Sequence, residues 1–236
     1  MSDFLPSPPL PDIARARGET VPAMGMWFVE FFNKKPVPWN YRQGSRIARA
    51  AYKGLHNLPV LLAGVSHIKN KIGQGANAEM LRLAAPLAFE RHTQVFDLSP
   101  RRFQFGPDRN AAYRIPFLFV EKGVIRVYFL QPRKGAGLDL DDFGMVGTVV
   151  KKYLLDVEFY GLKSDVEFVD VSAPEDGNVR LLRRYSLGDL KLWSDKRLAD
   201  RLTLITQALD WAADSDLVEK RRRIIRRPEP EMPLFD

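Results

Sequence analysis

Residues 115–131 read IPFLFVEKGVIRVYFLQ and have the pattern of a β-hairpin. The first half is almost continuously apolar, which is typical of a strand that is buried on both faces. A Lys-Gly pair then predicts a tight turn. In the second half, apolar residues alternate with Arg126 and Tyr128. We therefore expect a second strand with one apolar face and one face that carries these two side chains.

Helices are expected on the N-terminal side of this hairpin. Ser45 and Gly54 are residues typical of the N-cap and the C-terminal end of one helix. Gly73 and Gly75 are interpreted as a loop before a further helix. The expected helices cover residues 24–32, 45–54, 58–69 and 76–90.

Beyond the hairpin, the pattern alternates between helix and strand. Asp139 or Asp141 is expected to cap a helix that ends near Leu155, because the apolar residues between them recur at helical spacing. Two strands and a last capped helix follow. We expect these elements at 165–172, at 179–185 and from Ser194 or Asp195 onward.

This order predicts an α+β fold, with a helical N-terminal part followed by a mixed sheet and flanking helices. The first residues are rich in proline, which removes backbone donors and disfavours helix, so an extended arm is expected there. The predicted organisation is an arm at 1–22, a helical part at 23–95, an α/β core at 96–216 and a basic tail with an apolar docking peptide at 217–236.

The composition excludes several classes of chemistry. The chain has 236 residues, 45% of them apolar, and no cysteine. It is long enough to bury a sizeable core, and the lack of cysteine excludes disulfides, thiolate metal sites, iron–sulfur clusters and cysteine nucleophiles. We find neither a signal-peptide pattern nor an apolar run of membrane-spanning length, so no membrane partner and a cytoplasmic location are expected.

The net charge of +7 is unevenly distributed. Residues 1–100 carry +5, residues 101–136 carry +6, residues 137–178 carry −7 and residues 179–236 carry +3. Clustered Lys and Arg side chains neutralise phosphates and release counterions, so the basic segments are candidates for nucleic-acid binding. The alternative is that these side chains are solvated, or paired with the acidic middle segment.

Three basic features are candidate contacts to nucleic acid. One is a helix face formed by Arg46, Arg49 and Lys53, which Arg42 precedes. Another is the hairpin face, expected to combine Arg102, Arg126 and Tyr128 into a surface that stacks on bases and neutralises backbone. The third is the tail, with Lys220, Arg221, Arg222, Arg223, Arg226 and Arg227.

The order helix, strand, hairpin, helix, strand over residues 78–172 resembles the restriction-endonuclease-like fold. That family carries Pro-Asp and acidic-x-Lys elements on adjacent hairpin strands, where two carboxylates hold Mg²⁺ and a lysine assists the attacking water. Pro107-Asp108 resembles the first element and is also a common turn dipeptide. The second element is broken, because residues 121–123 lack the spacer and residues 131–134 lack a carboxylate. The resemblance therefore implies a nuclease-derived domain without activity.

An active enzyme remains an alternative, and the sequence does not decide between the two. A nuclease with a migrated active site would use Asp108, Glu121 and Asp170, with Lys134 as the lysine, and would need Mg²⁺. Without that alternative, no metal site and no cofactor are expected. Within the strand expected at 165–172, Asp170 lies on the opposite face from Asp165.

Residues 231–235, Glu-Met-Pro-Leu-Phe, resemble the peptide by which many bacterial replication and repair proteins dock on the sliding clamp. Met232, Leu234 and Phe235 match its apolar positions, whereas Glu231 stands where that motif usually has Gln. The resemblance implies a bacterial sliding clamp, or another protein, as a partner that binds these three side chains. The alternative is that the apolar residues fold back on their own domain.

These observations favour a non-enzymatic, nucleic-acid-associated protein with a C-terminal docking tail, and DNA is the expected nucleic acid. The metal-dependent nuclease and a protein-only interaction or adaptor module remain as alternatives.

Overall fold

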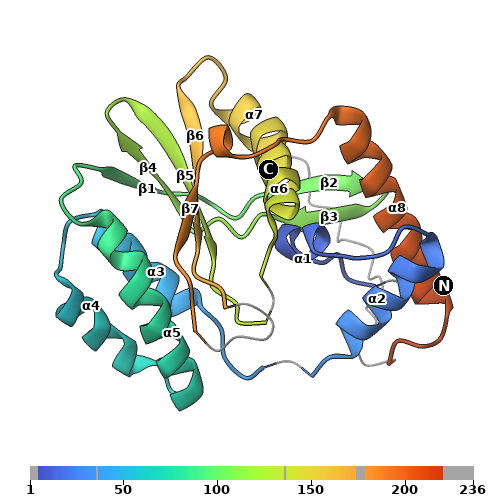
Figure 1. Ribbon diagram of the computed structural model, residues 1–236, viewed down its shortest axis with the longest axis horizontal. Helices are drawn as coiled ribbons and strands as arrows, with labels where there is room; N and C mark the ends of the chain where they lie inside the picture. Colours follow the sequence, from blue (N-terminus) through green and yellow to red (C-terminus); the bar gives the residue numbers. More distant parts are fainter. Residues whose placement is uncertain (1–4, 36, 136, 174–178, 220–236) are drawn as a thin grey trace, which may run out of the picture.

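The computed structural model describes residues 5–35, 37–135, 137–173 and 179–219. It is an α+β fold, as predicted, in which helices lie on both sides of a five-stranded mixed sheet (Figure 1). The strand order in this sheet is β1 (Gln94–Asp97), β4 (Phe117–Glu121), β5 (Val124–Gln131), β6 (Ser164–Asp170) and β7 (Arg183–Tyr185). A separate antiparallel pair consists of β2 (Arg102–Gly106) and β3 (Arg109–Ala112).

The predicted hairpin is confirmed as β4 and β5, which pair antiparallel from Glu121↔Val124 to Phe117↔Tyr128. Lys122 and Gly123 form its turn and have positive φ angles of 50° and 76°. Two such residues in succession are characteristic of the two-residue turn whose twist matches that of the flanking strands. The Lys-Gly pair therefore sets the register of the hairpin.

Helix α6 (Leu140–Val150) carries the chain from β5 to β6, which pair parallel with Phe129 beside Phe168. The helix starts at a capping box, in which the Asp139 side chain accepts from Asp142 N and the Asp142 side chain accepts from Asp139 N. This arrangement satisfies two backbone donors that a helix start leaves open. The helix continues through a π-helical turn, Lys151–Leu155, into α7 (Asp156–Glu158).

Two hydrophobic clusters lie on opposite faces of the sheet. One joins Phe129 and Phe168 to α6 and to three further helices, which are α1 (Leu10–Ala14), α2 (Val21–Asn33) and α8 (Asp195–Asp214). The other joins Phe117, Phe119 and Tyr128 to α3 (Arg42–Tyr52), α4 (Leu58–Ala63) and α5 (Lys71–Ala84). Short 3₁₀ helices at Gly64–His67, Ala85–Ala88 and Leu187–Asp189 complete the fold. No helix in the described part of the chain has the length and apolar content needed to cross a bilayer.

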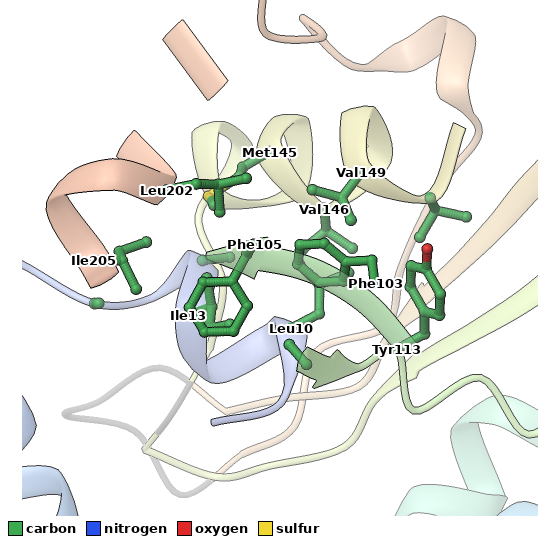
Figure 2. Close-up of a cluster of buried hydrophobic side chains, with 14 of the residues drawn as sticks. Leu10, Ile13, Phe103, Phe105, Tyr113, Met145, Val146, Val149, Leu202 and Ile205 are labelled. Atoms are coloured by element: carbon green, nitrogen blue, oxygen red, sulfur yellow. The ribbon is translucent and has the colours of Figure 1, made fainter. Parts of the chain in front are cut away.

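The proline-rich N-terminal segment differs from the expected extended arm. It contains α1, and the side chains of Leu5, Leu10 and Ile13 are completely buried. Figure 2 shows Leu10 and Ile13 beside Phe105 of β2, below Val146 of α6. These apolar side chains draw the segment into the core, and Pro11 is tolerated because it lies in the first turn of α1.

The starts of two helices also differ from the prediction. Helix α3 begins at Arg42, so Ser45 is not its N-cap, and Gly44 lies inside the helix. Gly44 N donates to Asn77 Oδ1 of α5 at 2.9 Å, and a side chain at Gly44 would collide with that oxygen. Gly73 and Gly75 lie inside α5, which is capped by Asn70. Gly44 and Gly73 thus permit close packing against Asn77 and Trp39, whereas Gly75 faces open space within the helix.

The packing of the N-terminal segment predicts a specific loss of stability. Leu10→Ala should lower the free energy of unfolding by about 2–5 kcal/mol, because the deletion leaves a cavity in a closed core. The matched control is Leu140→Ala, whose side chain is 60% exposed and starts α6. Urea unfolding followed by circular dichroism measures both, and equal effects would contradict the placement of α1 in the core.

Candidate nucleic-acid interface

Helix α3 presents a basic outer face. Arg42, Arg46 and Lys53 are exposed on it, and Arg49 is half-buried in an ion pair with Asp97 of β1. The opposite side of the helix is apolar, with Ile47, Ala48, Ala51 and Tyr52 packed toward the sheet. No acidic residue occurs in α3, so the outer face has no counter-charge within its own helix.

A second basic feature surrounds Asp12 of α1. This carboxylate is 2% exposed, and its Oδ1 accepts from Arg15 at 2.6 Å and from Arg133 at 2.6 Å. Arg133 follows the end of β5, so the contact joins residues 121 positions apart in the sequence. The packing of α1 into the core is what brings Asp12 to this end of the sheet.

Arg114 adds a third arginine at the same end. It precedes β4, whose first residue pairs near the end of β5, and its φ of 59° lies in the left-handed region. That conformation costs a residue with a side chain about 1–2 kcal/mol. Arg114 forms no hydrogen bond or ion pair within the described residues. Its side chain is exposed, and its pKa is lowered by partial desolvation and by the charges of Arg133 and Arg42.

We call Arg15, Arg114 and Arg133, gathered around Asp12, the arginine cluster. Burial lowers the pKa of Arg15, with a further contribution from Arg133 and in opposition to Asp12. The charge of Arg42, at the start of α3, is a further cause that lowers the pKa of Arg114. We call the cluster together with Arg42 and Arg46 the basic ridge.

A paired charge network occupies the covered face of the large sheet. Glu167 of β6 is 2% exposed and accepts from Arg91 at 2.9 and 3.0 Å, from Arg184 at 3.1 Å, and from the Tyr52 hydroxyl. Arg91 also donates to both oxygens of Glu121 at 2.8 Å. Burial lowers the pKa of Arg91, but these hydrogen bonds to Glu121 and Glu167 outweigh that effect, and the pKa is raised overall. The pKa of Tyr52 is raised chiefly by burial.

The predicted stacking surface of the hairpin is wrong. Tyr128 is fully buried and its ring is stacked on Phe117, with centroids 4.5 Å apart. Arg126 is engaged by Asp165 at 3.3 Å and by Glu121 at 3.6 Å. Arg102 is exposed but lies on β2, in the other sheet. Helices α3 to α5 cover the face that the alternation placed outside.

The structure does not gather the residues of the proposed migrated nuclease site. Asp108 lies in the turn between β2 and β3, not on the β4–β5 hairpin, in keeping with its interpretation as a turn residue. Asp170 lies on the opposite face of the sheet from Glu167 and binds Arg183 at 2.9 Å, whereas Glu121 is held by Arg91. Lys134 pairs with Glu79 at 2.9 Å. Within the described residues, no group of three or more His, Cys, Asp or Glu side chains is arranged to hold a metal ion.

The candidate residues of the tail lie outside the described residues. These are Lys220, Arg221, Arg222, Arg223, Arg226 and Arg227 of the basic run, and Met232, Leu234 and Phe235 of the docking peptide.

Comparisons with known proteins leave the family open. No protein-family model and no curated protein matches the chain. A solved structure described as the crystal structure of SSO0001 is similar over 77% of this chain and 78% of that chain, with 13% sequence identity and a TM-score of 0.30. A similarity this distant carries no argument about function.

Sequence reasoning missed the arginine cluster. Arg15 lies in the segment that the prolines predict to be an extended arm, and Arg133 lies in a segment, residues 131–134, that contains no carboxylate. Arg114 has no local sequence signal, because the restriction that Pro116 imposes falls on Ile115. The one available sign is the position of Asp12 itself, which lies next to the apolar residues Leu10 and Ile13. If these residues are buried, the carboxylate is buried with them and needs a partner.

The charge network predicts a pH dependence of stability. The pKa of Glu121 lies below its ordinary value, mainly because Arg91 donates hydrogen bonds to it. A lowered carboxyl pKa contributes stability above the unfolded-state pKa of about 4.3, and that contribution is lost as the pH falls through the folded-state pKa. Glu121→Gln should therefore lower the free energy of unfolding at pH 7, by about 1.5–3 kcal/mol, and by less at pH 3.

Urea unfolding at pH 7, 5 and 3 measures this difference. Glu19→Gln is the matched control, because Glu19 is exposed and should show a small effect at every pH. A Glu121→Gln effect that is equally large at pH 3 would contradict the stabilising role assigned to the ionised carboxylate.

Proposed function

We propose that this protein is a non-enzymatic, nucleic-acid-associated protein that binds the phosphate backbone of DNA through the basic ridge. The observation that carries the proposal is that Arg15 and Arg133 share the single carboxylate of Asp12, while Arg114 has no carboxylate partner in the described part of the chain and Arg42 and Arg46 are exposed on α3. Guanidinium groups match phosphate oxygens in geometry and charge, and remain ionised at any physiological pH.

The internal pairing of other arginines supports this location. Arg91, Arg126 and Arg184 are neutralised by Glu121, Asp165 and Glu167 on the covered face of the sheet. Arg101 pairs with Glu158, so part of the basic segment 101–136 is offset by the acidic segment that follows it. The positive charge of the hairpin is therefore largely neutralised within the fold, and the basic ridge is the better candidate for binding phosphate.

The non-enzymatic part of the proposal has its own support. On the face of β4 and β5 beneath α3 to α5, the central positions hold Phe117, Phe119 and Tyr128, all buried. The order of elements accords with a restriction-endonuclease-like core. It consists of the antiparallel strands β1, β4 and β5, then α6 and the parallel strand β6. We therefore propose a nuclease-derived domain without the carboxylate pair that holds Mg²⁺. Cleavage of DNA by the purified protein with Mg²⁺ would favour the nuclease alternative instead.

A salt titration tests the ridge. The double variant Arg42→Glu/Arg46→Glu should bind double-stranded DNA more weakly than the wild type. Its plot of log K against log salt should be shallower by about 1 for each phosphate that the variant no longer neutralises. Fluorescence anisotropy with labelled single- and double-stranded DNA at several salt concentrations gives both quantities.

The control is Lys196→Glu, a charge reversal at an exposed residue of α8, on the other side of the sheet from α3 (Figure 1). An equal weakening in this control would show that net charge alone governs binding. Wild-type protein that binds neither form of DNA would contradict the proposal and favour the protein-only interaction module.

We also propose that residues 231–235 dock on a bacterial sliding clamp or a similar partner groove, on the strength of their sequence. A labelled peptide of residues 228–236 should bind a bacterial sliding clamp in an anisotropy assay. Leu234→Ala/Phe235→Ala should weaken binding more than about tenfold, because apolar anchors supply most of the free energy in such interfaces. Glu231→Gln should strengthen it by restoring an amide donor. A peptide that does not bind, or an unaffected double variant, would contradict the resemblance.

A further inference from the structure

We propose that the arginine cluster is a preformed site for a phosphate monoester, the dianionic group at the end of a nucleic-acid strand. The choice of a strand end as the source of this group rests on the proposed function. The affinity of the site for phosphate does not.

The charge balance of the site points to a dianion. Arg15 and Arg133 each donate to the same oxygen of Asp12 at 2.6 Å, so the two donor nitrogens are at most twice that distance apart. Arg114 brings a third positive charge, and Asp12 offsets only one of the three. A phosphate monoester carries nearly two negative charges at neutral pH, whereas each phosphodiester of the backbone carries one.

Neighbouring carboxylates do not remove this excess. Asp142 is bound by Arg17 at 2.8 Å, and Asp139 is bound by the same guanidinium at 3.2 Å. On the other side, Glu79 is shared between Lys134 at 2.9 Å and Arg180 at 3.3 Å. Taken together, these three acids are balanced by three cations, which are Arg17, Lys134 and Arg180, so the unmatched charge stays with the three arginines of the cluster.

The cluster also has unused hydrogen-bond donors. Nε of Arg15 is buried and has no hydrogen-bond partner in the described structure. Arg114 forms no hydrogen bond or ion pair within the same residues. Arg114 is exposed, so its guanidinium donors are open to a ligand, and a phosphate group brings three strong acceptor oxygens. Burial is the main cause that lowers the pKa values of Arg15 and Arg114, and an anion in this position would offset the second cause, which is the charge of Arg133.

The three arginines are held by rigid parts of the fold. Arg15 follows α1, which is anchored by the buried Leu10 and Ile13. Arg133 is followed by the β-bridge of Lys134 with Ala173, and Arg114 is fixed in a left-handed backbone conformation before β4. Side chains on such elements lose little conformational freedom on binding, which favours affinity. With Arg42 adjoining the cluster, a strand could follow the ridge and end in the site.

Binding of matched oligonucleotides by the full chain tests the proposal. The probes are three forms of one single-stranded oligonucleotide, which carry a 5′-phosphate, a 3′-phosphate or only hydroxyl ends. Inorganic phosphate serves as the competitor. Wild-type protein should prefer one phosphorylated form by about tenfold, since charged hydrogen bonds are gained. Inorganic phosphate should reduce that preference and leave binding of the unphosphorylated form nearly unchanged.

Arg114→Asn should abolish the preference while the protein remains folded, because Asn tolerates the left-handed conformation. Arg133→Gln is the second variant, in which Asp12 keeps Arg15 as its partner, and Lys196→Gln is the control that should retain the preference. Salt-dependent binding without any end preference, or an end preference that survives in Arg114→Asn and Arg133→Gln, would overturn this inference and leave the proposed function intact. Binding of inorganic phosphate that Arg114→Asn abolishes, without binding of any oligonucleotide, would support the site and overturn the proposed function.

Discussion

Tyr128 and Phe129 are neighbours in β5, and both are fully buried on opposite faces of the sheet. A strand with this constraint needs an apolar layer on each side. Helices α3 to α5 form one layer, while α1, α2, α6 and α8 form the other. The N-terminal segment is drawn into the second layer for the same reason, and its one buried acid, Asp12, is carried with it. The position of the arginine cluster therefore follows from the burial of β5.

Because helices cover both faces of the sheet, the charged side chains on the central strands must be paired. Arg126 and Glu167 lie on the face beneath α3 to α5, where an unpaired charge is expensive. Arg91 resolves this problem by bridging Glu167 and Glu121. Arg126, which the sequence presented as part of a binding surface, is paired in the same way with Asp165 and Glu121. A buried ion pair is costly to break but contributes little net stability, so the network specifies the packing of Tyr52 over the sheet more than it strengthens the fold.

The local parts of this fold are readable from the sequence. The hairpin, α6 and α8 each combine a clear periodicity with a cap or a turn, and the structure has all of them where they were expected. The outward face assigned to Arg126 and Tyr128 was wrong because both residue types have apolar bodies with polar ends and fit either environment. Only coverage by helices far away in the sequence decides between the two. The contact of Asp12 with Arg133, over 121 positions, is non-local in the same way, and neither periodicity nor spacing contains it.

The arginine cluster is difficult to explain as a stabilising feature. It brings like charges together around one carboxylate, holds Arg114 in a strained backbone conformation and leaves the buried Arg15 Nε without an acceptor. Each of these arrangements costs free energy, and apolar residues at the same positions would avoid that cost. Asp12 nevertheless fixes two guanidinium groups side by side at a defined end of the sheet. A binding surface is typically the place where a well-packed core holds strain and uncompensated charge. A phosphate group would supply both the negative charge and the hydrogen-bond acceptors that this surface lacks.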